Sequence, residues 1–121
     1  DVVVVNFWYA ACPPCRAEAE DLEKVHQEYA EQLVHFVGVN VYDQAETINS
    51  FNSEFGVTYP SIIDVNDAEV RLAFADNVPP QAIPSTLVLD REGRVAAVIR
   101  GVADPSVLGA MIDRVLEENA A

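Results

Sequence analysis

The sequence has 121 residues, of which 50% are hydrophobic and 22% are charged, and this length and composition suit one domain with a buried core. The formal net charge of −13 argues against nucleic acids and anionic membrane surfaces as partners, because both would repel the chain. No run of about 18 apolar residues occurs, so the sequence predicts no membrane span.

The first third of the chain predicts a βαβ unit. Residues 2–8 form a β-branched, apolar run interrupted by Asn6, which is typical of a strand buried on both faces. From Pro13 onward the apolar period becomes helical, and we expect one buried face made of Ala17, Leu22, Val25, Tyr29 and Leu33. A second β-branched run at residues 34–42 should lie parallel to the first strand.

A segment of about residues 42–65 is predicted to add a helix and a short strand after this unit. Asp43 is expected to cap the N-terminus of the helix, with Glu46 reaching back to it, and Gly56 is expected to end the helix. Three apolar side chains would then form its buried stripe: Ile48, Phe51 and Phe55. The short strand should follow at residues 59–63.

The remaining residues predict a short helix, a hairpin and a final helix. A second capping pattern at residues 66–69 opens the short helix. After a proline-rich loop, residues 86–89 and 94–100 should pair as an antiparallel hairpin. Asp104 should cap the last helix, which has proline at its first position. This order predicts an α/β fold with a mixed central sheet flanked by helices.

The two cysteines of the chain are three positions apart, at Cys12 and Cys15. A disulfide scaffold would need more cysteines, and a structural zinc site would need four ligands, whereas the chain adds only two histidines outside any cluster. We therefore expect no metal site. A CxxC pair between a strand and a helix is typical of a redox-active dithiol.

The residues around this pair resemble the thioredoxin-like superfamily, and more closely its TlpA and ResA branch of extracytoplasmic thiol–disulfide oxidoreductases. The resemblance rests on three features: Asn6-Phe7-Trp8 followed by CPPC and Arg16-Ala17-Glu18, the segment Ile83-Pro84-Ser85-Thr86-Leu87, and the extra helix and strand after Val39-Asn40-Val41. The similarity covers essentially the whole chain. It implies a single thioredoxin-like domain over residues 1–121, with the insert at about 42–65.

The chemistry of the pair can be argued from position. Cys12 lies at or just before the N-terminus of a helix, where the dipole and free N–H groups favour a thiolate, the attacking species in disulfide exchange. Cys15 lies one turn further on the same side, so it can attack the mixed disulfide. Pro13 and Pro14 carry no N–H, so we expect a modestly stabilised thiolate, which favours a reductant. No cofactor is expected beyond the redox-active Cys12–Cys15 disulfide.

The resemblance also implies residues that contact the substrate or move protons. Pro84 should follow a cis peptide bond and present the backbone of Ile83 to an extended substrate, the alternative being an ordinary trans turn proline. Trp8 could be a core residue or a flat surface beside the thiols, and the resemblance favours the surface. Asp43 falls about where the ResA-like branch has an acid, so it could transfer protons to Cys15, the alternative being a helix cap alone.

The function implied by the resemblance is thiol–disulfide exchange with proteins. Reduction is the favoured direction, and apocytochrome c is one expected substrate. An upstream membrane protein is expected to supply electrons. The protein is expected to be a monomer at an extracytoplasmic location, which it would reach through an N-terminal segment absent here. A secreted disulfide-forming oxidase and a redox-silent binding module of the same fold are the alternatives. Tyr9 disfavours a thiol peroxidase, which needs a threonine there, and a copper protein of the Sco type needs CxxxC and a distant histidine.

Overall fold

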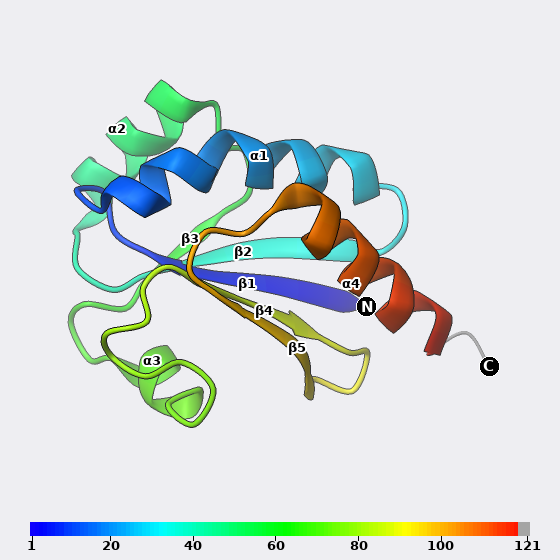
Figure 1. Cartoon of the computed structure of the whole chain (residues 1–121). Helices are drawn as coiled ribbons and strands as arrows, with labels where there is room; N and C mark the ends of the chain where they lie inside the picture. Colours follow the sequence, from blue (N-terminus) through cyan, green and yellow to red (C-terminus); the bar gives the residue numbers. More distant parts are fainter. Residues whose placement is uncertain (119–121) are drawn as a thin grey trace.

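The computed structural model describes residues 1–118, in which one mixed sheet is covered by helices (Figure 1). The elements follow in the order β1 (Val2–Trp8), α1 (Pro13–Tyr29), β2 (Val34–Asn40), α2 (Ala45–Phe55), β3 (Ser61–Ile63), α3 (Glu69–Ala73), β4 (Ser85–Leu89), β5 (Val95–Arg100) and α4 (Pro105–Glu118). The predicted α/β class, with a helix and a short strand inserted after the βαβ unit, is confirmed.

The sheet has the strand order β3-β2-β1-β4-β5. Strand β1 pairs in parallel with β2, from Val2 opposite Val34 to Trp8 opposite Asn40, and it pairs antiparallel with β4 on its other side. Strands β4 and β5 form the expected antiparallel hairpin. Because parallel strands end at the same edge, the chain leaves Trp8 toward α1 beside the place where it leaves Asn40 toward α2.

Two apolar layers enclose the sheet. On one face α1 and α4 pack against β1, β2 and β4 through buried side chains that include Leu22, Val25, Tyr29, Leu108, Ile112 and Val115. On the other face Val70 and Phe74 from the region of α3, together with Val78 and Ile83, pack against Phe7 and Leu87. Burying each large aliphatic side chain contributes about 1.5–3 kcal/mol, so these layers hold the ends of β1 and α1 in place.

The buried face of α1 differs from the predicted one at both ends. Ala17 is exposed, and Leu33 is 61% exposed because α1 ends at Tyr29 and the chain turns through a positive φ of 58° at Leu33 before it enters β2. At 100° per residue, the face that holds Leu22 and Val25 includes position 18 and not position 17. Glu18 therefore lies among the buried side chains of α1.

Of the predicted helix ends, the start of α4 and the end of α2 are confirmed, and the starts of α2 and α3 are wrong. Asp104 accepts hydrogen bonds from the backbone of the first turn of α4, and Gly56 ends α2 with a φ of 69°. At α3, however, the N-cap is Ala68, which has no capping side chain, and Asp67 accepts a hydrogen bond from the Glu69 N–H at 3.3 Å. The buried carboxylate of Asp64 takes that place by accepting hydrogen bonds from the Val70 and Arg71 N–H groups at 3.0 and 2.9 Å.

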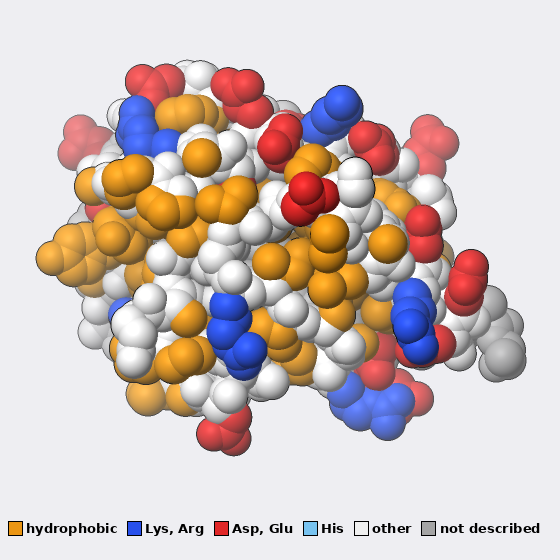
Figure 2. Space-filling view, viewed as in Figure 1, with side chains coloured by type: hydrophobic (Ala, Val, Ile, Leu, Met, Phe, Trp, Pro, Cys, Tyr) orange, Lys and Arg blue, Asp and Glu red, His pale blue; other side chains and the backbone are white. Residues whose placement is uncertain are grey.

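The surface is unevenly composed. Figure 2 shows acidic side chains around much of the visible face, whereas hydrophobic side chains gather at the left, over the end of the sheet where Figure 1 places the β1–α1 turn. No helix within residues 1–118 combines the length and apolar character needed to cross a bilayer.

Candidate active site

The cysteine pair lies at the junction of β1 and α1. Cys12 and Cys15 are joined as a disulfide, with their Cα atoms 5.2 Å apart. Cys12 is the N-cap of α1, and its Sγ accepts a hydrogen bond from the Cys15 N–H at 3.2 Å. Pro13 and Pro14 occupy the first helical positions and offer no N–H, so the amide of Cys15 is the first donor available to the sulfur. The predicted N-cap position of Cys12 is confirmed.

The disulfide is buried against side chains from the inserted helix. Cys12 and Cys15 are each 2% exposed and belong to an apolar cluster with Trp8, Ala19, Ile48 and Phe51. Because Ile48 and Phe51 come from α2, the insert forms one wall of the site. The sulfurs are thus held in an apolar environment, where a charged thiolate is disfavoured unless hydrogen bonds compensate.

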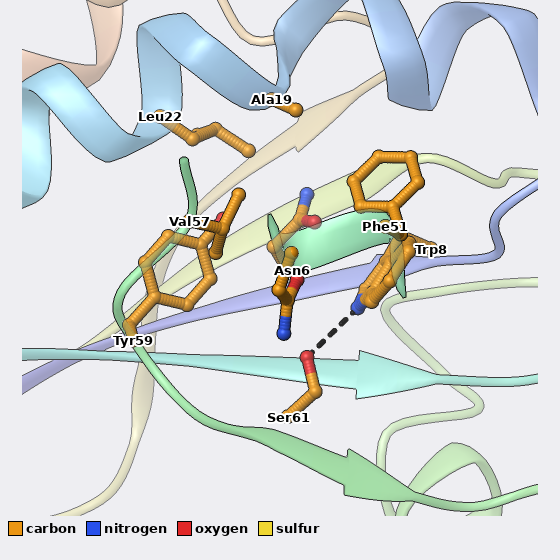
Figure 3. A pocket seen from close by; sticks show the side chains of 9 residues that line it. Asn6, Trp8, Ala19, Leu22, Phe51, Val57, Tyr59 and Ser61 are labelled. Atoms are coloured by element: carbon orange, nitrogen blue, oxygen red, sulfur yellow. Dashed lines mark hydrogen bonds between the residues drawn. The ribbon is translucent and has the colours of Figure 1, made fainter. Parts of the chain in front are cut away.

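Trp8 belongs to this cluster and is only 5% exposed. Its ring is 4.5 Å from that of Phe51, and its Nε1 donates a hydrogen bond to the Ser61 hydroxyl at 3.1 Å (Figure 3). Gly38 faces the same place, where a side chain would collide with Ser61 and with the indole. The indole is therefore a core side chain next to the thiols in this structure, and its contact with a substrate stays a prediction.

Asp43 holds the turn that precedes Cys12. Its Oδ2 accepts a hydrogen bond from the Ala10 N–H at 2.7 Å and another from the side-chain amide of Asn40 at 3.1 Å. The predicted capping role is wrong, because Gln44 is the N-cap of α2 and no side chain caps that helix. The Ala10 amide, brought close by the parallel pairing of β1 and β2, takes the carboxylate instead. The proton-transfer role of Asp43 stays a prediction.

Arg16 binds the backbone carbonyl of Ala10, the residue whose N–H group binds Asp43. Its guanidinium donates a hydrogen bond to the Ala10 carbonyl at 3.2 Å and forms an ion pair with Glu54 of α2 at 3.1 Å. It also lies over the Phe55 ring, 4.9 Å from the centroid. The peptide groups on both sides of Ala10 are thus tied by side-chain contacts to the insert, which positions the turn before the cysteines.

Glu18 is the titratable residue that the sequence analysis missed. It lies one turn after Cys15 on the buried face of α1 and is 1% exposed. Its carboxylate accepts hydrogen bonds from the side-chain amide of Asn6 at 2.8 Å and from the Ala103 N–H at 3.0 Å. Burial raises the pKa of Glu18 to about 7, although both hydrogen bonds oppose that rise. The sequence feature that could have indicated Glu18 is its spacing of three residues from Cys15, which places the two side chains on the same side of the helix.

The segment before β4 approaches the cysteines from another part of the chain. The Ile83–Pro84 peptide bond is cis, as expected, and Pro84 is buried. The Pro84 carbonyl accepts a hydrogen bond from the Gly101 N–H at 2.8 Å. Ile83 is half-buried and packs against the cluster that contains Cys12 and Cys15. The structure thus brings Ile83 and Pro84 to the predicted neighbourhood, and their contact with a substrate stays a prediction.

Metal ligands do not gather at this site or elsewhere in residues 1–118, where no group of three His, Cys, Asp or Glu side chains could hold an ion. The functional groups that the structure assembles are therefore a disulfide at a helix N-terminus and a buried carboxyl group one turn along that helix. This arrangement is suited to two-electron exchange between sulfur atoms coupled to proton transfer.

Comparisons with known proteins agree with this chemistry. Residues 1–112 match the Redoxin family. The chain is similar to the thiol-disulfide oxidoreductase ResA of Halalkalibacterium halodurans, with 31% identity over 99 residues that cover 82% of this chain and 53% of that protein. It therefore spans about half the length of the curated relatives it matches.

Solved structures show the same fold. A thiol:disulfide interchange protein of the thioredoxin family from Chlorobium tepidum TLS is 28% identical and superposes with a TM-score of 0.85. The superposition covers 96% of this chain and 80% of that one. A secreted thiol-disulfide isomerase from Corynebacterium glutamicum is 32% identical, with a TM-score of 0.84 over 97% of this chain and 71% of that one. The fold is thus thioredoxin-like.

Proposed function

Because the chain belongs to the Redoxin family, we propose that it is a thiol–disulfide oxidoreductase that exchanges electrons with proteins through Cys12 and Cys15. The observation that carries this proposal is a Cys12–Cys15 disulfide at the N-terminus of α1 in a thioredoxin-like fold. We propose further that residues 1–121 form one domain that carries an insert at about 42–65.

In the reducing direction the two cysteines act in sequence. The Cys12 thiolate attacks one sulfur of a substrate disulfide, which forms a Cys12–substrate disulfide and releases the other substrate sulfur as a thiolate. Cys15 then loses its proton and attacks the Cys12 sulfur, so that the Cys12–Cys15 disulfide forms and the second substrate thiol leaves. Two electrons pass from the dithiol to the substrate, and an external dithiol must later return them.

The second step needs a group that accepts the proton of Cys15. Glu18 is suited to this role because it lies one turn away on the same buried face. Burial raises the pKa of Glu18 to about 7, and a general base is most effective when its pKa lies near the working pH. Asp43 is a second candidate acceptor, although its hydrogen bonds to Ala10 and Asn40 also support a purely positioning role.

The substrate contacts are proposed at the segment beside the disulfide. Ile83 lies against the cysteine cluster and precedes the cis peptide bond to Pro84, so the Ile83 backbone would meet an extended substrate there. Trp8 would contribute to this surface only through its small exposed part. Protein thiols and disulfides are the proposed substrates, with apocytochrome c as one of them, and a membrane redox partner would resupply electrons.

The proposed direction is reduction of the substrate. The two prolines leave the Cys15 amide as the nearest backbone donor to the Cys12 sulfur, and a thiolate with few donors makes the dithiol a better electron donor. An extracytoplasmic location is supported by similarity to the secreted thiol-disulfide isomerase of C. glutamicum. A disulfide-forming oxidase is the alternative direction of the same chemistry.

Two measurements test the proposal. The Cys15→Ser variant should trap a mixed disulfide with a disulfide-bonded test protein, whereas Cys12→Ser should trap far less, because Cys12 is the attacking residue. The reduction potential of the native pair should be near or below about −250 mV for a reductase, and a value near about −120 mV would instead indicate an oxidase. The proposal would be overturned if neither variant trapped a mixed disulfide and the native protein did not catalyse the reduction of insulin.

A further inference from the structure

A cavity of about 360 Å³ opens beside the cysteine pair. Its walls come from three parts of the chain: Tyr9 after β1, Tyr42 after β2, and the segment that contains Pro80 and Ile83 before β4. Arg71 of α3 completes the lining. The cavity thus combines aromatic and apolar walls with one cationic side chain, a combination typical of sites that hold a small charged group in a fixed orientation.

The cavity adjoins the reacting sulfurs through shared residues. Tyr9 and Ile83 line the cavity, and both also pack against the cluster that contains Cys12 and Cys15. A polypeptide whose cysteine reaches that disulfide therefore passes next to the cavity. This wall of the cavity is accessible from solvent, because Tyr42 is 72% exposed.

Arg71 has unused capacity to bind an anion. Its backbone N–H is held by Asp64 at 2.9 Å, which positions the residue, but its guanidinium makes one long hydrogen bond, to the Pro80 carbonyl at 3.4 Å. Within residues 1–118 it forms no ion pair, although the sequence has 20 acidic and 7 basic residues and Arg16, Arg94 and Arg114 each pair with a carboxylate. Arg71 is a residue of intermediate burial that shares this cavity with two tyrosines, and its guanidinium can bind a carboxylate through two parallel hydrogen bonds.

We propose that this cavity binds an acidic side chain of the substrate polypeptide close to its reacting cysteine, and that Arg71 determines this specificity. The inference rests on the proposed oxidoreductase function. Tyr9, Tyr42 and Ile83 would contact the aliphatic stem of the acidic side chain while Arg71 pairs with its carboxylate. Because a net charge of −13 repels acidic polypeptides as a whole, the preferred segment carries its acidic residue among neutral or basic ones.

The test uses short neutral peptides that each contain one cysteine and are joined as disulfide dimers. Glutamate, glutamine or lysine is placed at one position at a time on either side of the cysteine, and kcat/KM for reduction is measured with the full chain. At one or more positions the native protein should prefer glutamate over glutamine by about three- to fivefold, as expected for a partly exposed charge pair, and should use lysine least.

Variants of Arg71 should change the preference among the glutamate, glutamine and lysine peptides. Arg71→Gln should remove the difference between the glutamate and glutamine peptides, and Arg71→Glu should favour the lysine peptide. Arg114→Gln is the matched control, because it makes the same change in net charge on α4, where Arg114 pairs with Glu118. It should keep the native preference.

The outcomes separate the two proposals. Absence of reduction of every peptide by the native protein would overturn the oxidoreductase function and the subsite with it. Reduction of all peptides with the same kcat/KM would leave that function standing and overturn the subsite. An equal loss of glutamate preference in Arg71→Gln and Arg114→Gln would also overturn it, because the effect would then come from net charge.

Discussion

Replacing Glu18 with glutamine should change how the stability of the oxidised protein depends on pH. The carboxyl group is 1% exposed between the Asn6 amide and the Ala103 N–H, and burial raises its pKa from 4.5 to about 7. In the unfolded chain the carboxyl group returns to its ordinary pKa. Between pH 4.5 and 7, therefore, the folded protein holds a proton that the unfolded chain has released.

The sign and size of the effect follow from this difference. Since the folded state binds more protons in this window, the free energy of unfolding of the native protein falls as the pH rises from 4.5 to 7. The difference between pKa values of 7 and 4.5 is 2.5 units, which corresponds to about 3 kcal/mol at about 1.36 kcal/mol per unit. Glutamine carries no charge to bury, so Glu18→Gln should gain up to about 3 kcal/mol relative to the native protein between about pH 4 and pH 8.

Urea unfolding measures this difference directly if the disulfide is kept intact, so that cysteine titration does not contribute. The free energies of unfolding of the native protein and of Glu18→Gln are compared at each pH from about 4 to 8. Glu20→Gln serves as the control, because it makes the same chemical change at an exposed position of the same helix. A difference between Glu18→Gln and the native protein that does not change with pH would refute the reasoning, because it would mean that Glu18 stays ionised in the folded protein.

Three other predictions concern positions that the fold brings together. Asp43→Ala should lower the free energy of unfolding by about 1–2 kcal/mol because the Ala10 N–H loses its acceptor, and Asp43→Asn, which keeps an oxygen, should lose less; equal losses in urea unfolding would contradict this. Gly38→Ala should cost about 1–3 kcal/mol, since the added methyl group collides with the Ser61 side chain, and an unchanged Tm would contradict the predicted collision. Tyr29→Phe should cost about 1–2 kcal/mol by removing the hydroxyl that joins α1 to α4. In the native protein burial raises the pKa of Tyr29 to about 12, so an absorbance titration that ionises every tyrosine near pH 10 would count against this contact.

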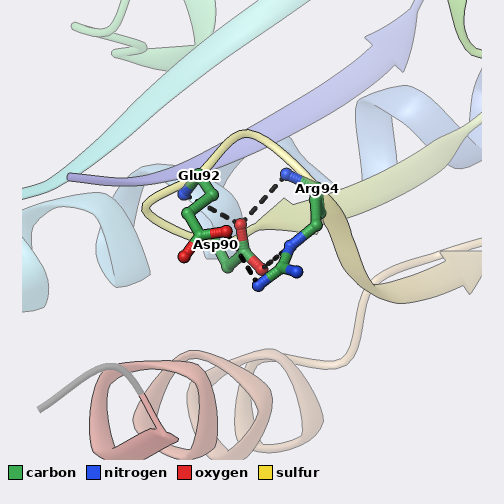
Figure 4. A network of polar contacts seen from close by, with 3 residues as sticks. All are labelled: Asp90, Glu92 and Arg94. Atoms are coloured by element: carbon green, nitrogen blue, oxygen red, sulfur yellow. Dashed lines mark hydrogen bonds and ion pairs between the residues drawn. The ribbon is translucent and has the colours of Figure 1, made fainter. Parts of the chain in front are cut away.

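Much of the fold followed from local sequence, because short-range patterns decide strands, turns and helix starts. The β-branched run of residues 2–8 became β1, and the cap at Asp104 formed as predicted. The hairpin turn is also local: Asp90 accepts hydrogen bonds from the Glu92 and Arg94 N–H groups at 2.9 and 3.0 Å and pairs with the Arg94 side chain (Figure 4). These contacts hold the pKa of Asp90 below its usual range, with the Arg94 backbone hydrogen bond as the largest cause.

The candidate cysteines were likewise predictable, because a CxxC pair between a strand and a helix places both sulfurs within one turn. The family resemblance added the cis peptide bond before Pro84, which no local pattern in the chain distinguishes from an ordinary trans proline. Capping patterns were less informative. Asp43 has the right sequence neighbours for an N-cap, but a backbone amide in the turn between β1 and α1 binds its carboxylate instead.

Tertiary structure alone decided what surrounds the cysteines, because those contacts join residues far apart in the chain. Asp43 meets the Ala10 N–H across 33 positions, and Glu18 meets the Ala103 N–H across 85. Burial by such distant segments raises the pKa of Glu18 to about 7, which the helical pattern of the sequence did not predict. The sequence by itself determined which two sulfurs are paired, because the two cysteines lie one helical turn apart, whereas the packing of distant segments decided the environment around them.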